Sequence, residues 1–259
     1  MTSASRSRRR DGELPSATIS EFDGVRYLHL GHTPWVQGAM RIHRPRKLEL
    51  EYIQRMMAWL LWRPSDQLAQ GHAVQLGLGA GALTRFAHQV LRWRTTAVEL
   101  NPSVIDANRL WFHLPPDDAL LQVLHTDAAA WVQDDAHLET VDALMVDLYD
   151  HEAAAPVLDD EAFYAQCRAL LTEEGCMTVN LFGRASSYER SLGKMAAAFG
   201  EDAVWAFKPT REGNTVVLAQ RTASRPSREA LAARAETIQT RWNLPATKWL
   251  RVFKPCRKP

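Results

Sequence analysis

Two aspartates follow directly on an apolar segment in the middle of the sequence. Asp147 and Asp150, three positions apart, come after the run Val141–Val146. In α/β sheets, ligands bind beside the carboxyl ends of strands. A carboxylate pair there can hold an amine and, once desolvated, take a proton from it. The segment predicts a site for a cationic substrate, with Asp147 and Asp150 as catalytic residues. The alternative is a strand-end acid at Asp147 and a solvated, capping residue at Asp150.

A glycine-rich segment with an acid downstream predicts a nucleoside site. Gly77 lies near the end of an apolar run over residues 73–78, and Gly79 and Gly81 follow the run and precede a helical pattern. Glycines let the chain turn sharply and bring the backbone at the helix start close to a ligand. Glu99 comes 22 positions after Gly77, near the ~20 expected for an acid that accepts hydrogen bonds from a ribose. A plain strand-to-helix turn is the alternative, and a dinucleotide fits as well as a sulfonium nucleoside.

A third acid favours the sulfonium nucleoside. Asp127 stands at the end of the strand expected over residues 121–126, directly before a short helical pattern that begins at Ala128. A carboxylate there can accept a hydrogen bond from an adenine amino group, as in folds that bind S-adenosylmethionine and its relatives. Asp127 is also a suitable N-cap for the helix that follows. The two roles are compatible.

Composition and charge exclude several classes of protein. Of the 259 residues, 46% are hydrophobic and 24% are charged, which is an ordinary globular composition. Lys and Arg number 31 and Asp and Glu 30, so the net charge is +1. We therefore expect no nucleic-acid partner and no binding to an anionic membrane. No apolar run approaches the length that crosses a bilayer.

Cysteine and histidine positions predict neither a disulfide framework nor a metal. The three cysteines, Cys167, Cys176 and Cys256, form no CxxC pair. The nine histidines do not stand at metal-ligand spacing from other ligand types. We expect a reducing, cytoplasmic compartment and a site without metal.

Four regions follow one another along the chain. Residues 1–16 form a basic leader that we expect to be disordered, and residues 17–47 predict a β-hairpin. Residues 48–221 begin with an amphipathic helix over 48–62, after which strands and helices alternate. Near-continuous apolar strands in such an alternation predict a mostly parallel sheet covered on both faces. Residues 222–259 predict a helical tail with one helix over 227–239. The expected strands cover 73–78, 95–100, 121–126, 141–146, 176–181, 204–207 and 215–219.

With these motifs in place, the sequence resembles the spermidine synthases, the polyamine aminopropyltransferases, over residues 19–219. The resemblance implies a methyltransferase-like Rossmann fold with a mostly parallel seven-stranded sheet, preceded by a small N-terminal β-hairpin domain. It assigns Gln37 to donor binding and Tyr52, in a helix ahead of the glycine loop, to substrate binding. It also implies that Asp147 deprotonates the attacking amine while Asp150 helps to hold it. The implied donor is decarboxylated S-adenosylmethionine as a co-substrate, with no tightly bound cofactor.

Three positions depart from the family pattern. Ala80 stands where the glycine loop usually has an Asp that contacts the aminopropyl ammonium. His151 replaces a Pro, and the segment 209–213 lacks a Tyr of the substrate site. Two further functions are therefore kept open, a methyltransferase that uses S-adenosylmethionine and a non-catalytic nucleoside-binding protein of the same fold. The expected partner is a small-molecule amine, with a possible homodimer formed through the edge of the N-terminal hairpin.

Overall fold

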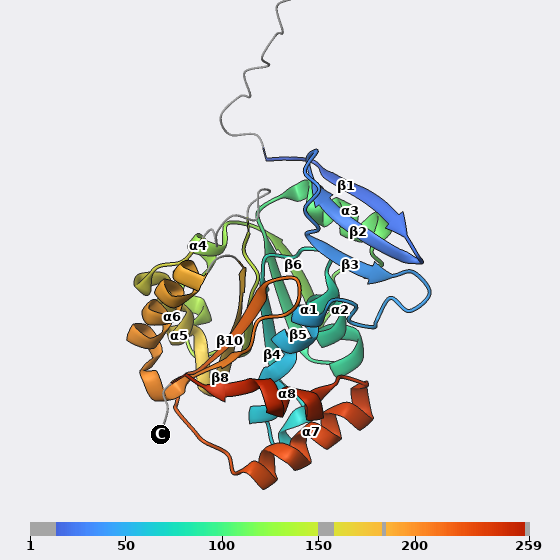
Figure 1. Ribbon diagram of the computed structural model, residues 1–259. Helices are drawn as coiled ribbons and strands as arrows, with labels where there is room; N and C mark the ends of the chain where they lie inside the picture. The colour runs from blue at the N-terminus through green and yellow to red at the C-terminus, as the bar shows by residue number, and fades with distance from the viewer. Residues whose placement is uncertain (1–13, 150–157, 183–184, 257–259) are drawn as a thin grey trace, which may run out of the picture.

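The N-terminal part of the chain forms a small antiparallel sheet. The computed structural model describes residues 14–149, 158–182 and 185–256. The small sheet consists of β1 (Ala17–Phe22), β2 (Val25–Leu30) and β3 (Gly38–Arg41), in that order (Figure 1). Asp23 and Gly24 join β1 to β2 with positive φ angles of 50° and 70°. Such a two-residue turn matches the twist of the paired strands.

The larger sheet carries the site and has eight strands in the described residues, in the order β11-β9-β10-β8-β7-β4-β5-β6. Strands β4 to β8 pair in parallel, whereas β10 runs antiparallel to β8 and to β9. The order reverses at β4, with β5 on one side and β7 on the other, and ligands bind at such switch points. The bounds are β4 (His72–Leu76), β5 (Arg94–Glu99), β6 (Leu121–His125), β7 (Val141–Val146), β8 (Leu171–Phe182), β9 (Val204–Phe207), β10 (Asn214–Gln220) and β11 (Phe253–Pro255).

Helices cover both faces of this sheet. Successive side chains of a strand point to opposite faces, and the residues on both faces are buried. On one face lie α1 (Glu51–Met56), the 3-10 helix that continues it (Met57–Trp62), α7 (Arg228–Trp242) and α8 (Ala246–Val252). On the other lie α4 (Ala128–Trp131), α5 (Glu161–Leu170) and α6 (Ala185–Phe199) (Figure 1). The N-terminal sheet packs on α3 (Pro102–Trp111) and the glycine loop. No helix in the described segments is long and apolar enough to span a membrane.

The strand-helix alternation predicted from the sequence is confirmed, with three additions. The predicted hairpin gains β3, a four-residue strand that includes a glycine and lacks a strand-like pattern. The predicted helical tail contains the second helix α8 and the strand β11, so the sheet has eight strands rather than seven. Phe253 of β11 stacks on Phe207 of β9 with ring centroids 4.3 Å apart. A three-residue strand that ends in proline has no periodic signal of its own. The helical pattern after the glycine-rich segment forms a short α-helix, α2 (Ala82–Arg85), followed by a π-helix (Phe86–Leu91).

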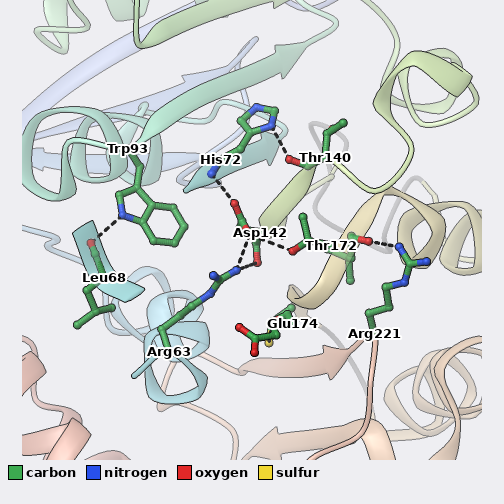
Figure 2. A network of polar contacts seen from close by, with 11 residues as sticks. Arg63, Leu68, His72, Trp93, Thr140, Asp142, Thr172, Glu174 and Arg221 are labelled. Carbon is green, nitrogen blue, oxygen red and sulfur yellow. Dashed lines mark hydrogen bonds and ion pairs between the residues drawn. The ribbon is translucent and has the colours of Figure 1, made fainter. Parts of the chain in front are cut away.

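A polar network joins the amino ends of three strands at the sheet edge opposite the carboxyl ends (Figure 2). The Asp142 carboxylate accepts hydrogen bonds from the Arg63 guanidinium at 2.7 Å, the His72 backbone N–H at 2.8 Å and the Thr172 hydroxyl at 2.9 Å. Arg63 and His72 are both 7% exposed and the Asp142 side chain is 20% exposed, so the network is largely buried. It fixes the alignment of β4, β7 and β8, whose opposite ends carry the site residues.

The His72 side chain predicts a pH-dependent stability. Both ring nitrogens form hydrogen bonds, and burial lowers the pKa of His72 to about 4. The unfolded chain takes up this proton near pH 6.5 and the folded chain does not, so stability falls as the pH drops from 6.5 toward 4, by up to about 3 kcal/mol. Urea unfolding at pH 7 and pH 4 is expected to show this loss in the wild type and a smaller one in His72→Gln. Replacing the exposed His43 by Gln is the matched control. Equal losses in all three proteins would contradict the assignment.

Candidate active site

A cavity of about 900 Å³ opens at the carboxyl ends of β4, β5, β7 and β8, beneath the N-terminal sheet. Its walls come from both sheets and from the loops that follow the strands. Seven predicted site residues line it together: Gln37, Tyr52, Gly77, Gly79, Glu99, Asp127 and Asp147. Segments that are distant in sequence therefore converge on one volume, at the switch in strand order where the sequence predicts a ligand.

The glycine loop brings backbone against backbone at two points. Gly77 has φ +83°, and a Cβ there would lie 2.3 Å from the Asp147 carbonyl oxygen. Gly79 has φ +50°, and its Cβ would lie 2.8 Å from the Gln37 carbonyl oxygen. No L side chain fits at these distances. The glycines thus hold the loop against the acid-bearing segment on one side and the N-terminal sheet on the other.

Gly81 and Ala80 are not among the residues that line the cavity. Gly81 is the N-cap of α2 with φ +65°, and it does not line the cavity. Ala80 is 3% exposed and packs under Gly38, where a Cβ would come within 2.6 Å of the Ala80 backbone nitrogen. Position 80 therefore lies in the interface between loop and β3 rather than in the cavity wall.

Two of the predicted acids, Glu99 and Asp127, line the cavity close to the ends of β5 and β6. Glu99 accepts hydrogen bonds from the backbone N–H groups of Leu78 and Asn101, both at 2.8 Å. Burial raises the pKa of Glu99, and these backbone donors oppose the rise. Asp127 caps α4 by accepting from the Ala129 N–H at 2.8 Å and also lines the cavity. The capping role and the position at the cavity therefore coexist.

Asp147 also lines the cavity, and its carboxylate accepts hydrogen bonds from two side chains. The Asn180 amide donates to Oδ1 at 2.9 Å, and the Tyr52 hydroxyl donates to Oδ2 at 3.3 Å. Burial raises the pKa of Asp147 to about 6, and these two hydrogen bonds oppose part of the rise. The side chain is thus ionised at neutral pH with a raised proton affinity, as a general base requires. Asp150 and His151 lie outside the described residues.

Sequence reasoning missed the residues that orient Asp147. The Asn180 oxygen accepts from the Asn214 amide at 3.0 Å, which leaves the Asn180 nitrogen directed at the Asp147 carboxylate. Both asparagines are less than a tenth exposed. The sequence signal that could have indicated Asn180 is a polar residue near the carboxyl end of an otherwise apolar segment of β8. The Tyr149 hydroxyl donates a hydrogen bond to the backbone carbonyl oxygen of Asn180 at 3.2 Å, and Tyr149 lines the cavity.

The cavity has a strongly negative lining. Six acidic residues line it, and none of its described lining residues is Lys, Arg or His. Two of the six, Glu49 and Glu51, are ion-paired with Arg41 and Arg55. Besides Glu99, Asp127 and Asp147, the acids are Glu49, Glu51 and Glu212. Such a lining favours a ligand with positive charges and disfavours one that carries a carboxylate of its own.

Curated proteins resemble this chain over most of its length. A polyamine aminopropyltransferase of Neisseria meningitidis serogroup A is 32% identical over 233 residues, which cover 89% of this chain and 86% of that protein. One from Chromobacterium violaceum is 30% identical with the same coverage. No protein-family model matches the sequence.

Solved structures resemble the fold. A probable spermidine synthase from Corynebacterium glutamicum superposes with a TM-score of 0.70 at 18% identity, covering 86% of this chain and 83% of that one. Human methyltransferase-like protein 13, solved in complex with SAH, superposes with a TM-score of 0.68 at 20% identity, covering 75% of this chain and 93% of that one. At these identities the likeness concerns the fold alone.

Proposed function

Because the chain belongs to the polyamine aminopropyltransferase family, we propose that it transfers an aminopropyl group from decarboxylated S-adenosylmethionine to a di- or polyamine. The amine nitrogen forms the new bond to carbon, the carbon–sulfur bond breaks, and methylthioadenosine leaves with the electron pair of that bond. The proton lost by the amine goes to a carboxylate of the protein. The donor is a co-substrate rather than a bound cofactor.

One observation carries the choice of donor. The described lining of the cavity contains no basic side chain, and four of its acidic residues, Glu99, Asp127, Asp147 and Glu212, have no ion-pair partner among the described residues. Decarboxylated S-adenosylmethionine carries a sulfonium and an ammonium, both of which suit this lining. Intact S-adenosylmethionine adds an α-carboxylate that would find no counter-ion among these residues and would be repelled by them. The lining thus supports aminopropyl transfer over methyl transfer.

Asp147 is the general base in this proposal. A free alkylamine has a pKa near ~10, like a lysine, so it must lose a proton before it can attack. The Asp147 carboxylate takes that proton, and its pKa of about 6 is raised toward the acceptor's. Tyr52 and Asn180 hold the two carboxylate oxygens in place. Asp150 is proposed to help hold the amine.

The nucleoside is placed by the other predicted residues. Each Glu99 oxygen accepts one backbone N–H and keeps a lone pair for a ribose hydroxyl. Asp127 uses Oδ1 for the helix cap, which leaves Oδ2 for an adenine amino group. Gln37, Gly77 and Gly79 line the same cavity and are proposed to contact the rest of the donor. Positioning in line with the carbon–sulfur bond then supplies most of the rate enhancement.

The direct test is an assay of methylthioadenosine release. Decarboxylated and intact S-adenosylmethionine are each incubated with putrescine, cadaverine and spermidine. We expect methylthioadenosine and the aminopropylated amine from the decarboxylated donor only. A folded protein that releases no methylthioadenosine with any of these amines would refute the proposed transfer, and methylated amine from the intact donor would establish the methyltransferase alternative.

A further inference from the structure

Two aromatic rings form an outer wall of the cavity beyond Asp147. Trp35, in the loop between β2 and β3, meets Phe182 at the end of β8 edge to face, with ring centroids 6.4 Å apart. Both line the cavity. On its other side the Phe182 ring is 3.3 Å from the place where a Cβ on Gly213 would lie. The rings thus join the N-terminal sheet to the turn before β10.

The wall continues past the reacting centre toward Glu212. Phe182 lies two residues beyond Asn180 on β8, a rise of about 7 Å, and it pairs with Asn214 of β10. Glu212 precedes Asn214 by two residues and lines the same cavity. From Asp147 outward, the cavity therefore presents a carboxylate, two aromatic rings and a second carboxylate.

Glu212 differs from Glu49 and Glu51, two other carboxylates of the cavity lining, in having no ion-pair partner in the described part of the chain. Glu49 is paired with Arg41 at 2.6 Å, and Glu51 is paired with Arg55 at 2.5 Å. Glu212 is exposed at the cavity wall and has no ion-pair or hydrogen-bond partner among the described residues. A carboxylate that is not paired with a protein cation is available to form an ion pair with a cationic ligand.

We propose that Glu212 is the specificity-determining residue for the outer nitrogen of the acceptor, which it holds as an ammonium, while Trp35 and Phe182 cover the methylene chain between the two nitrogens. This assignment rests on the proposed function of the cavity. It makes the acceptor an amine with charged nitrogens at both ends, and it separates the roles of the two carboxylates. Asp147 takes a proton from the nitrogen that attacks. Glu212 binds the other nitrogen, which stays charged as an ammonium.

A matched pair of ligands isolates the outer nitrogen. 1,4-Diaminobutane has it, and n-butylamine has the same carbon chain without it. Binding of each amine is measured by calorimetry in the presence of methylthioadenosine, so that the result does not depend on turnover. We expect the wild type to bind the diamine at least tenfold more tightly than butylamine, and Glu212→Gln to reduce that preference to threefold or less. Glu173→Gln, which removes an exposed carboxylate at the other end of β8, is expected to keep the wild-type preference.

A second variant tests the aromatic wall. Trp35→Leu is expected to weaken both amines by a similar factor, because it removes cover from the shared carbon chain. A wild type without preference for the diamine, or a preference that survives Glu212→Gln, would overturn the proposal. The proposed reaction is tested by methylthioadenosine release, and the role of Glu212 is tested by amine binding. Because the two measurements are independent, a failure of one proposal can be told from a failure of the other.

Discussion

Replacing Asp147 by asparagine is expected to lower kcat by a factor of about 10²–10⁴, the usual contribution of a general base. The variant keeps the shape of the side chain but has no carboxylate to accept the proton of the amine. Its new amide nitrogen would also face one of the two present donors, Asn180 or Tyr52. Since burial raises the pKa of Asp147 to about 6, the charged form costs stability at pH 7, so the melting temperature is expected to stay unchanged or to rise.

The pH dependence of wild-type activity is a second test of the role of Asp147. Below about pH 6 the Asp147 carboxyl keeps its proton, so kcat/KM is expected to fall about tenfold per pH unit on the acid side. Steady-state rates between pH 5 and pH 8 measure this limb. Asp106→Asn, the same substitution on the exposed side of α3, is the control and is expected to retain full activity. Wild-type rates in Asp147→Asn would remove this residue from the mechanism.

Replacing Gly77 by alanine is expected to lower kcat about 100-fold and to destabilise the fold by at least about 1–2 kcal/mol. The loss of stability comes from a positive φ of +83°, which costs an L residue about that much. The loss of activity comes from the new Cβ, which would lie 2.3 Å from the Asp147 carbonyl oxygen and must push that segment away. A displacement of about 1 Å in a catalytic group can reduce the rate by two orders of magnitude.

Gly193→Ala is the matched control for this substitution. Gly193 lies inside α6, and a Cβ there meets nothing within 4 Å. Alanine is expected to stabilise the helix by about 0.5–1 kcal/mol and to leave the kinetics unchanged. Kinetics and urea unfolding of both variants give the comparison. Activity near the wild-type level in Gly77→Ala would mean that the loop and the Asp147 segment move independently.

The sequence predicted the fold best where a periodic pattern was long. Strands such as Val141–Val146 and Val204–Phe207 match their predicted bounds because apolar runs between turn residues leave little choice. The family resemblance and the methyltransferase-like fold are confirmed by relatives and solved structures. Strand β11 could not be predicted, since it depends on Phe253 meeting Phe207 after the chain has folded. The domain boundaries and a homodimer stay predictions.

Residues of the candidate site could be predicted where the residue type and its place in the sequence by themselves indicate a role. Glycines at sharp turns and acids at strand ends are visible in the sequence, and the cavity gathers them. The Asn214–Asn180–Asp147 hydrogen-bond chain was not predictable, because it joins three strand ends by antiparallel and parallel register. The burial of Ala80 beneath Gly38 is likewise a tertiary contact between sheet and loop.

Calorimetric binding of the two sulfonium nucleosides to the wild-type protein tests the selection of a cationic donor most directly. The negative lining predicts that decarboxylated S-adenosylmethionine binds at least about tenfold more tightly than the intact form, a difference of about 1.4 kcal/mol. The preference is expected to shrink in high salt, which screens the exposed part of the lining. Equal affinities, or tighter binding of the carboxylated form, would contradict the account.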